Sequence, residues 1–160
     1  MIRPPRTAHL PAFAGLAAAL LLAGCVTAPK PLQGDYAPLS PNATKDSDSG
    51  ANVRWGGRVV SVEPQADRTC INVIAQPLSG NAQPDGSDIS LGRFRACRAG
   101  FYDPAVFKAN REVSFVGRVE GFDTVRIGDY DYRQPRMAAD VVFLWPERRQ
   151  VDVIIERGWW

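Results

Sequence analysis

Apolar and polar residues alternate along much of the chain between positions 53 and 145, and this alternation predicts an all-β domain. The clearest case is the segment 111–121 (REVSFVGRVEG), whose period of two residues is typical of a strand with one buried face. We expect Val113, Phe115 and Val119 to point inward and Ser114, Arg118 and Glu120 to point outward.

Four further segments share this β-rich texture and are separated by turns rich in glycine, proline, asparagine and aspartate. The other predicted strands are Val53–Glu63, Thr69–Leu78, Leu91–Arg98 and Met137–Trp145, with a long hairpin region over Phe122–Arg136. Gly56 and Gly57 predict a bulge or bend in the first strand. Asp103–Phe107 predicts a helical turn, with an aspartate cap followed by proline. Five strands with a helical turn between the third and the fourth predict a small five-stranded OB-like barrel, and a β-sandwich is the alternative.

The first 25 residues have a different pattern. Arg3 and Arg6 precede an apolar run, Leu10 to Leu22, which is too short to span a membrane and is typical of a secretory signal. The run ends in Leu-Ala-Gly-Cys at 22–25, the pattern of a lipobox, so we expect residues 1–24 to be removed and Cys25 to be acylated. Stable attachment to a bilayer takes two or more acyl chains.

Residues 25–52 follow as the acylated cysteine and a tether. The segment contains Pro29, Pro31, Pro38 and Pro41, has no apolar period, and ends in Ser-Asp-Ser-Gly. Treated as a flexible coil it would reach about 30 Å from the membrane. Docking of part of it through Leu32, Tyr36 and Leu39 stays open. The predicted β-barrel domain covers 53–146, and a C-terminal tail covers 147–160.

Charge and composition exclude several function classes. Removal of Arg3 and Arg6 with the signal leaves as many basic as acidic residues, 17 of each, which argues against nucleic acid as a partner. The one histidine, His9, is removed too, so the mature chain has no imidazole for a general base, a nucleophile pair or a typical zinc site. We therefore expect no metal, no cofactor and no enzymatic activity.

Cys70 and Cys97 are the cysteines that remain beside Cys25, and an exported compartment favours their pairing. Strand parity places each on the polar face of its strand, Cys70 with Asn72 and Cys97 with Arg95, where a cross-strand bridge between adjacent strands can form. Two free thiols are the alternative.

Several ordered motifs between Val53 and Pro146 resemble the Slp family of outer-membrane lipoproteins. The matching pieces are VRWGG at 53–57, QPL at 76–78, GRF at 92–94, GFYDPAVF at 100–107, REVSFVGRVEG at 111–121, IGDYDYRQP at 127–135 and ADVVFLWP at 139–146. The resemblance implies an outer-membrane anchor, exposure to the periplasm and an association with stress or stationary phase. It does not indicate any biochemical activity. Valine rather than aspartate follows Cys25, which agrees with the outer membrane because aspartate there is the usual signal for retention in the inner membrane.

The densest group of functional side chains lies in the hairpin region and consists of Asp129, Tyr130, Asp131, Tyr132 and Arg133. Exposed aromatic rings beside charges favour a binding surface for a partner or ligand. The alternative is a structural hairpin whose tyrosines cover the barrel end and whose aspartates pair with Arg126 or Arg133. Two aspartates alone are too few oxygen ligands for calcium.

Other clusters have a simpler structural interpretation. Arg93, Arg95 and Arg98 form either an anion-binding strip or an ion-paired strand face. Trp55 and Trp145 are expected to pack in or beside the core, whereas the indoles of Trp159 and Trp160 suit a membrane or protein interface or dock on the barrel.

The leading hypothesis is therefore a non-enzymatic lipoprotein tethered to the inner leaflet of the outer membrane and facing the periplasm, which acts in envelope maintenance or stress and has an envelope protein or glycan as partner. A module that binds a glycan or small ligand is the second hypothesis. A hydrolase that acts through Asp103, Asp129 or Asp131 is the third.

Overall fold

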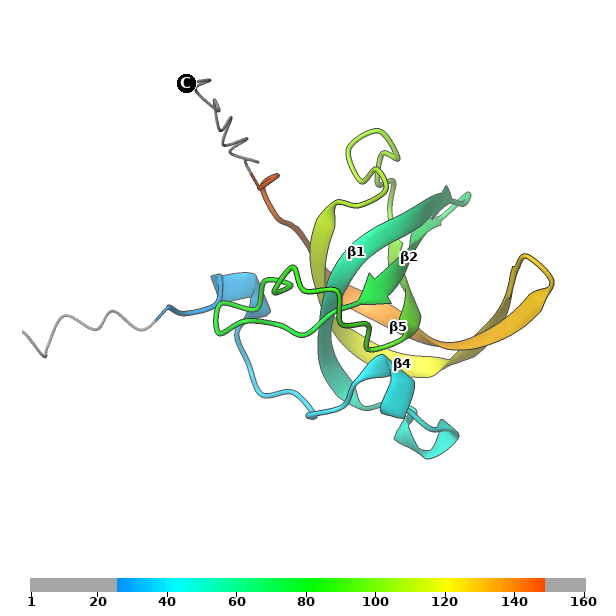
Figure 1. Cartoon of the computed structure of the whole chain (residues 1–160), viewed down its shortest axis with the longest axis horizontal. Coiled ribbons are helices and arrows are strands. Elements are labelled where there is room, and N and C mark those ends of the chain that lie inside the picture. Colours follow the sequence, from blue (N-terminus) through cyan, green and yellow to red (C-terminus); the bar gives the residue numbers. More distant parts are fainter. Residues whose placement is uncertain (1–25, 149–160) are drawn as a thin grey trace, which may run out of the picture.

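The computed structural model describes residues 26–148, which form five β-strands and three short 3₁₀ helices (Figure 1). The strands are β1 (Asn52–Pro64), β2 (Arg68–Ala75), β3 (Arg93–Ala99), β4 (Glu112–Ile127) and β5 (Tyr130–Leu144). The helices are η2 (Lys30–Leu32), η3 (Pro41–Ala43) and η4 (Asp46–Asp48), all in the segment before β1.

The five strands close into one barrel in the order β1-β2-β3-β5-β4, in which β3 and β5 are parallel and all other neighbours are antiparallel. The prediction of an all-β, five-stranded OB-like barrel is thereby confirmed, and the β-sandwich alternative is wrong because a single ring contains every strand. The region 122–136, expected as a hairpin, is the continuation of β4 and β5.

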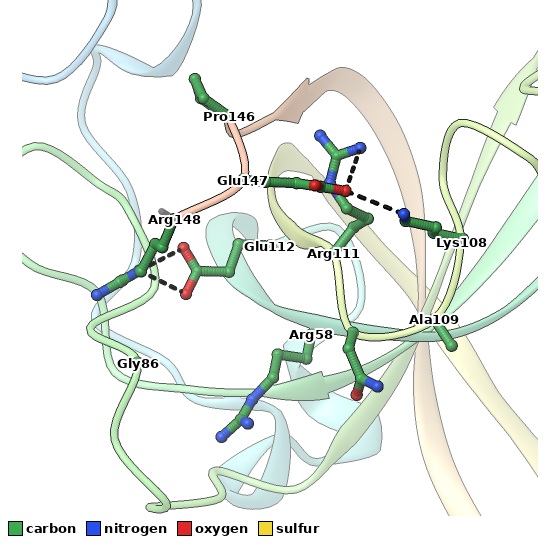
Figure 2. A pocket seen from close by; sticks show the side chains of 10 residues that line it. Arg58, Gly86, Lys108, Ala109, Arg111, Glu112, Pro146, Glu147 and Arg148 are labelled. Atoms are coloured by element: carbon green, nitrogen blue, oxygen red, sulfur yellow. Dashed lines mark hydrogen bonds and ion pairs between the residues drawn. The ribbon is translucent and has the colours of Figure 1, made fainter. Parts of the chain in front are cut away.

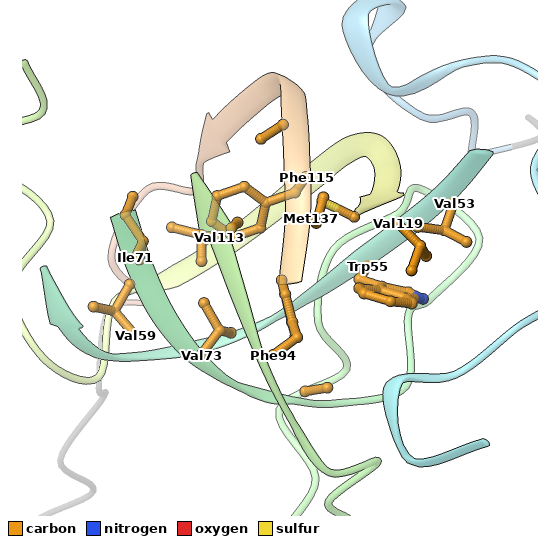
Figure 3. Close-up of a cluster of buried hydrophobic side chains, with 13 residues drawn as sticks. Val53, Trp55, Val59, Ile71, Val73, Phe94, Val113, Phe115, Val119 and Met137 are labelled. Atoms are coloured by element: carbon orange, nitrogen blue, oxygen red, sulfur yellow. The ribbon is translucent and has the colours of Figure 1, made fainter. Parts of the chain in front are cut away.

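The barrel interior holds one apolar cluster, to which all five strands contribute (Figure 3). Phe94 lies at its centre, edge-on to Trp55 at 5.2 Å and to Phe115 at 5.6 Å between ring centroids. Val113, Phe115 and Val119 are buried in this cluster, and Arg118 and Glu120 are exposed, as the alternation predicts. The cluster consists of Val53, Trp55, Val59, Ile71, Val73, Ala75, Phe94, Ala96, Val113, Phe115, Val119, Met137 and Ala139.

A second apolar cluster covers the outside of β4 and β5 and consists of Leu32, Ala82, Val116 and Trp145. It explains a departure from the sequence pattern: Ser114 lies on the outer side of its strand but is fully buried. Its hydroxyl donates to the carbonyl oxygen of Ala82 at 2.7 Å and accepts from the indole nitrogen of Trp145 at 2.9 Å.

The segment before the barrel is packed on it, as the alternative of docking through Leu32, Tyr36 and Leu39 predicts, and residues 28–51 do not form a free coil. Leu32 is fully buried in the second cluster. The Trp55 indole nitrogen donates to the carbonyl oxygen of Leu39 at 2.6 Å, and the Gly50 amide donates to the carbonyl oxygen of Val119 at 2.8 Å. These hydrogen bonds give backbone groups of the segment partners in the barrel. The segment therefore packs without a strand or a long helix, and its sequence has no apolar period.

Two smaller features were also predicted. Residues 103–107 form the expected single helical turn, in which the Val106 and Phe107 amides donate to the Asp103 carbonyl oxygen at 3.0 Å and the Ala105 amide donates to the Asp103 carboxylate at 2.8 Å. Of the bulge or bend expected at Gly56-Gly57, the bulge lies elsewhere, because the irregular register between β1 and β2 falls between Val59 and Ser61, and the glycine pair marks a bend. Glycine is required at position 57 because a Cβ there would lie 1.9 Å from the Ile74 carbonyl oxygen, at the bend where β1 pairs with β2 and β4 together.

Candidate functional site

The β4–β5 hairpin extends beyond the barrel as a two-stranded ribbon. β1 stops pairing with β4 at Arg118, and β3 pairs with β5 only over residues 136–138, so residues 122–135 pair only with each other. Figure 1 shows the ribbon, in yellow and orange, projecting to one side of the molecule. The chain reverses through Gly128, whose φ of +60° is left-handed, and Asp129. Glycine in the first position of a two-residue loop is what a type II′ hairpin turn favours.

The five residues predicted as a binding surface all lie at this end of the hairpin. Tyr130 and Tyr132 share one face, with ring centroids 6.5 Å apart. Asp129 and Asp131 both form ion pairs with Arg126, at 3.7 and 3.4 Å. The pairing of the aspartates with Arg126 agrees with the structural alternative, whereas Tyr130 remains 68% exposed.

Arg133 and Tyr132 connect the hairpin to the rest of the molecule. The Arg133 guanidinium lies over the Phe122 ring, 3.6 Å from its centroid, and forms an ion pair with Asp46 of η4 at 2.6 Å. The Tyr132 hydroxyl accepts a hydrogen bond from the Arg93 amide at 3.3 Å. These contacts set the hairpin base against η3, η4 and the start of β3.

A hollow of about 360 Å³ lies between the hairpin and the N-terminal segment, and we call it the hairpin site. It combines aromatic rings, guanidinium groups, a carboxylate and an amide, the mixture that binds polar partners through stacking and hydrogen bonds. Its lining consists of Pro41, Asn42, Thr44, Arg93, Phe122, Tyr130, Asp131, Tyr132, Arg133 and Pro135.

The three arginines of β3 separate into different roles. Arg95 forms ion pairs with Glu63 at 2.5 Å and with Asp123 at 3.9 Å, and Arg98 donates to the Asp140 carbonyl oxygen. Arg93 lines the hairpin site. They therefore form no continuous strip of free cations, and the strand face at Arg95 is ion-paired.

A larger hollow of about 660 Å³, the charged cleft, opens where β5 ends (Figure 2). Glu147 pairs with Lys108 at 3.1 Å and with Arg111 at 3.6 Å, and Arg148 pairs with Glu112 at 2.9 Å. The hydrogen bond from Lys108 and the positive charges of Lys108 and Arg111 hold the pKa of Glu147 below its ordinary value. These pairs fix the chain beyond β5 to the loop before β4.

Sequence reasoning missed the charged cleft because its residues come from separate segments of the chain. Arg58 belongs to β1, Gly86 to the loop after β2, Lys108 to the loop after β3 and Arg148 to the end of the described chain. No local spacing joins them, and only the barrel's closure brings them together.

Several predicted features lie outside the described residues, namely the signal peptide, Cys25 and the tail residues Trp159 and Trp160. Within residues 26–148, no helix is long and apolar enough to cross a membrane. Over the same range, no group of three histidine, cysteine or acidic residues is placed to hold a metal ion. Cys70 and Cys97 face each other in the β2–β3 register and are joined by a disulfide.

Comparison with known proteins adds family membership to this geometry. The uncharacterized lipoprotein YeaY of Escherichia coli (strain K12) is 30% identical over 138 residues, which cover 83% of this chain and 71% of that protein. Outer membrane protein Slp of the same strain is 25% identical over 143 residues, covering 86% of this chain and 76% of its own length. An uncharacterized protein of Haemophilus influenzae (strain ATCC 51907 / DSM 11121 / KW20 / Rd) is 30% identical over 131 residues, which cover 78% of this chain and 70% of that protein. No solved structure matches the chain.

The family described as "Outer membrane lipoprotein Slp family" matches this chain over residues 22–160. This range begins within the lipobox and contains all five strands. The motifs that resemble this family lie on the strands and loops of one closed barrel, and the curated relatives cover most of the same chain. This protein belongs to the outer membrane lipoprotein Slp family.

Proposed function

We propose that the protein is a non-enzymatic lipoprotein anchored to the outer membrane through acylated Cys25, with its barrel in the periplasm. In this proposal it takes part in envelope maintenance or in the response to stress or stationary phase. The observation that supports the proposed anchor is the Leu-Ala-Gly-Cys motif at 22–25. This motif follows a signal-like apolar run and falls at the start of the family match.

The environment of the candidate carboxylates supports a binding role rather than catalysis. Asp103 caps the turn at 103–107, and Asp129 and Asp131 pair with Arg126. Each of these groups already has a structural contact: Asp103 lies in the loop after β3, and Asp129 and Asp131 lie side by side at the hairpin tip, where they share one arginine. Acid–base hydrolysis by carboxylates needs two of them held on either side of one bond.

The hairpin site is the surface that we propose binds a partner in the envelope. Its support is an exposed tyrosine at the tip of a projecting ribbon, with a base fixed by Arg133. Aromatic residues on a rigid element bind with little loss of conformational entropy. A glycan or small ligand is the second candidate, favoured by the hollow between Tyr132, Asn42 and Arg93.

Membrane separation tests the anchor. Inner and outer membranes are separated by density from cells that express the natural protein, Cys25→Ser or the control Val26→Ala. We expect the natural protein and V26A in the outer membrane, and C25S as a soluble or unprocessed form. Recovery of the natural protein with inner membranes, or of C25S with outer membranes, would contradict the proposal.

Site-specific photo-crosslinking tests the binding surface. A photoreactive residue replaces Tyr130, or replaces Asp67 in the exposed turn between β1 and β2 as the matched control. A protein adduct formed at position 130 and absent at 67 supports an envelope partner. A glycan adduct at 130 supports the second candidate, and equal adducts at both positions contradict a specific site on the hairpin.

A further inference from the structure

The packed part of the chain begins three residues after Cys25, the proposed anchor. Of the residues after Cys25, only Val26 and Thr27 precede Ala28, which packs against the second apolar cluster. Three residues of extended chain span about 10 Å. The coil predicted from the sequence would instead place the barrel at about 30 Å.

The first packed segment is held by several independent contacts. Leu32 is fully buried among Ala82, Val116 and Trp145. Its carbonyl oxygen accepts a hydrogen bond from the Arg54 guanidinium at 2.8 Å. The Gln33 side-chain amide donates to the Ala28 carbonyl oxygen at 2.7 Å, so the turn around η2 is closed on itself.

A loop from another part of the chain lies beside this segment. The Val26 carbonyl oxygen lies against Gly80 in the loop between β2 and β3, and Ala82 of that loop packs in the same cluster as Leu32. We call residues 26–34 and 78–84 together the anchor-proximal face. Figure 1 shows the start of the described chain, in blue, on the side opposite the hairpin tip.

The composition of the anchor-proximal face suits a lipid surface. Lys30 is its only charged residue, in a chain in which 22% of residues are charged. The hairpin, by contrast, carries Asp123, Arg126, Asp129, Asp131 and Arg133. The two segments themselves carry no carboxylate to repel lipid phosphate groups, although the exposed Asp35 and Asp85 follow them directly, and a lysine near the surface is attracted to these groups.

We propose that the anchor-proximal face rests on the lipid headgroups of the leaflet that holds the acyl chains, so that the barrel has a fixed orientation with the hairpin site pointing away from the membrane. This inference rests on the proposed acylation of Cys25. It assigns the hairpin site to partners in the periplasm, beyond the headgroup layer, rather than to lipids of the anchoring leaflet.

The test uses the acylated full-length mature protein in vesicles of phosphatidylethanolamine and phosphatidylglycerol. A fluorescent amino acid replaces either Asn81 on the anchor-proximal face or Asp129 at the hairpin tip, and the acceptor dye is on lipid headgroups. We expect energy transfer from position 81 to exceed that from position 129 severalfold. Equal transfer from both positions overturns the inference.

A linker variant supplies the matched control. Insertion of about 20 Gly/Ser residues between Thr27 and Ala28 adds a coil of roughly 25 Å and leaves the chain from Ala28 onward packed as before. It should abolish most of the difference between the two positions, and an unchanged difference would show that the short linkage does not set the orientation. The mass of the N-terminal peptide of each sample reports acylation, so a missing acyl group refutes the proposed anchor, whereas acylated protein with equal transfer refutes only the fixed orientation.

Discussion

Removal of the Cys70–Cys97 disulfide is expected to cost a large part of the stability of the barrel. The bond links residues 27 positions apart, and the chain between them contains the long loop from the end of β2 to the start of β3. The chain-entropy relation for a closed loop of this length gives about 3.5 kcal/mol, through restriction of the unfolded chain. A whole domain is typically stable by about 5–15 kcal/mol.

The variant that tests this value is the double replacement Cys70→Ala/Cys97→Ala. Both side chains are buried, at 1% and 7% exposure, so alanine avoids burying the hydroxyl that serine would introduce. The expected loss lowers the melting temperature by about 10–20 °C for a domain of this size. The free energy of unfolding is measured by denaturant titration of both proteins without a reducing agent.

The control is the natural protein titrated after reduction, which should unfold at the same denaturant concentration as the double variant. A loss below about 1 kcal/mol would refute the reasoning from loop closure. Two reactive thiols in the denatured, unreduced natural protein would refute the bond itself.

Three further predictions test the packing and the electrostatics. Gly57→Ala should destabilise the barrel by more than about 3 kcal/mol because the new methyl group meets a backbone carbonyl of β2. The control Gly80→Ala should leave the unfolding midpoint unchanged, since its Cβ has only an ordinary contact at 3.7 Å. Equal midpoints for the two variants would contradict the close approach at Gly57. Leu32→Ala should cost about 2 kcal/mol and speed proteinase K cleavage within residues 28–50, since Leu32 is the fully buried apolar side chain of that segment. Unchanged cleavage would mean that the segment is held without it. Because the Lys108 interaction lowers the pKa of Glu147, its contribution to stability is present above the ordinary pKa of 4.5 and is lost as the pH falls through the lower folded value. Glu147→Gln should therefore flatten the fall of the unfolding midpoint below pH 4.5, and an identical pH profile would count against the pair.

The barrel was predictable because its interior follows local periodicity. Val113, Phe115 and Val119 alternate with polar residues, and this alternation alone identifies the inner face of β4. The pairing of the two aspartates with Arg126 was also open to prediction, because a hairpin places nearby residues of the chain opposite each other.

Features made by contacts between distant segments were not predictable. Ser114 has the outward parity of a solvent-exposed residue, and its burial depends on Trp145 and on the loop that carries Ala82. Leu32 is a single apolar residue among prolines, so no apolar period predicts that it packs on the barrel. The charged cleft likewise needs the closed barrel before Arg148 and Glu112 can meet.

The central claim is that Cys25 becomes the acylated first residue of an outer-membrane protein, and intact mass measurement of the protein purified from separated outer membranes tests it most directly. The account predicts a chain that begins at Cys25 and carries the added mass of its acyl groups on the N-terminal peptide. A mature protein that retains residues 1–24, or that begins elsewhere with Cys25 unmodified, would contradict it.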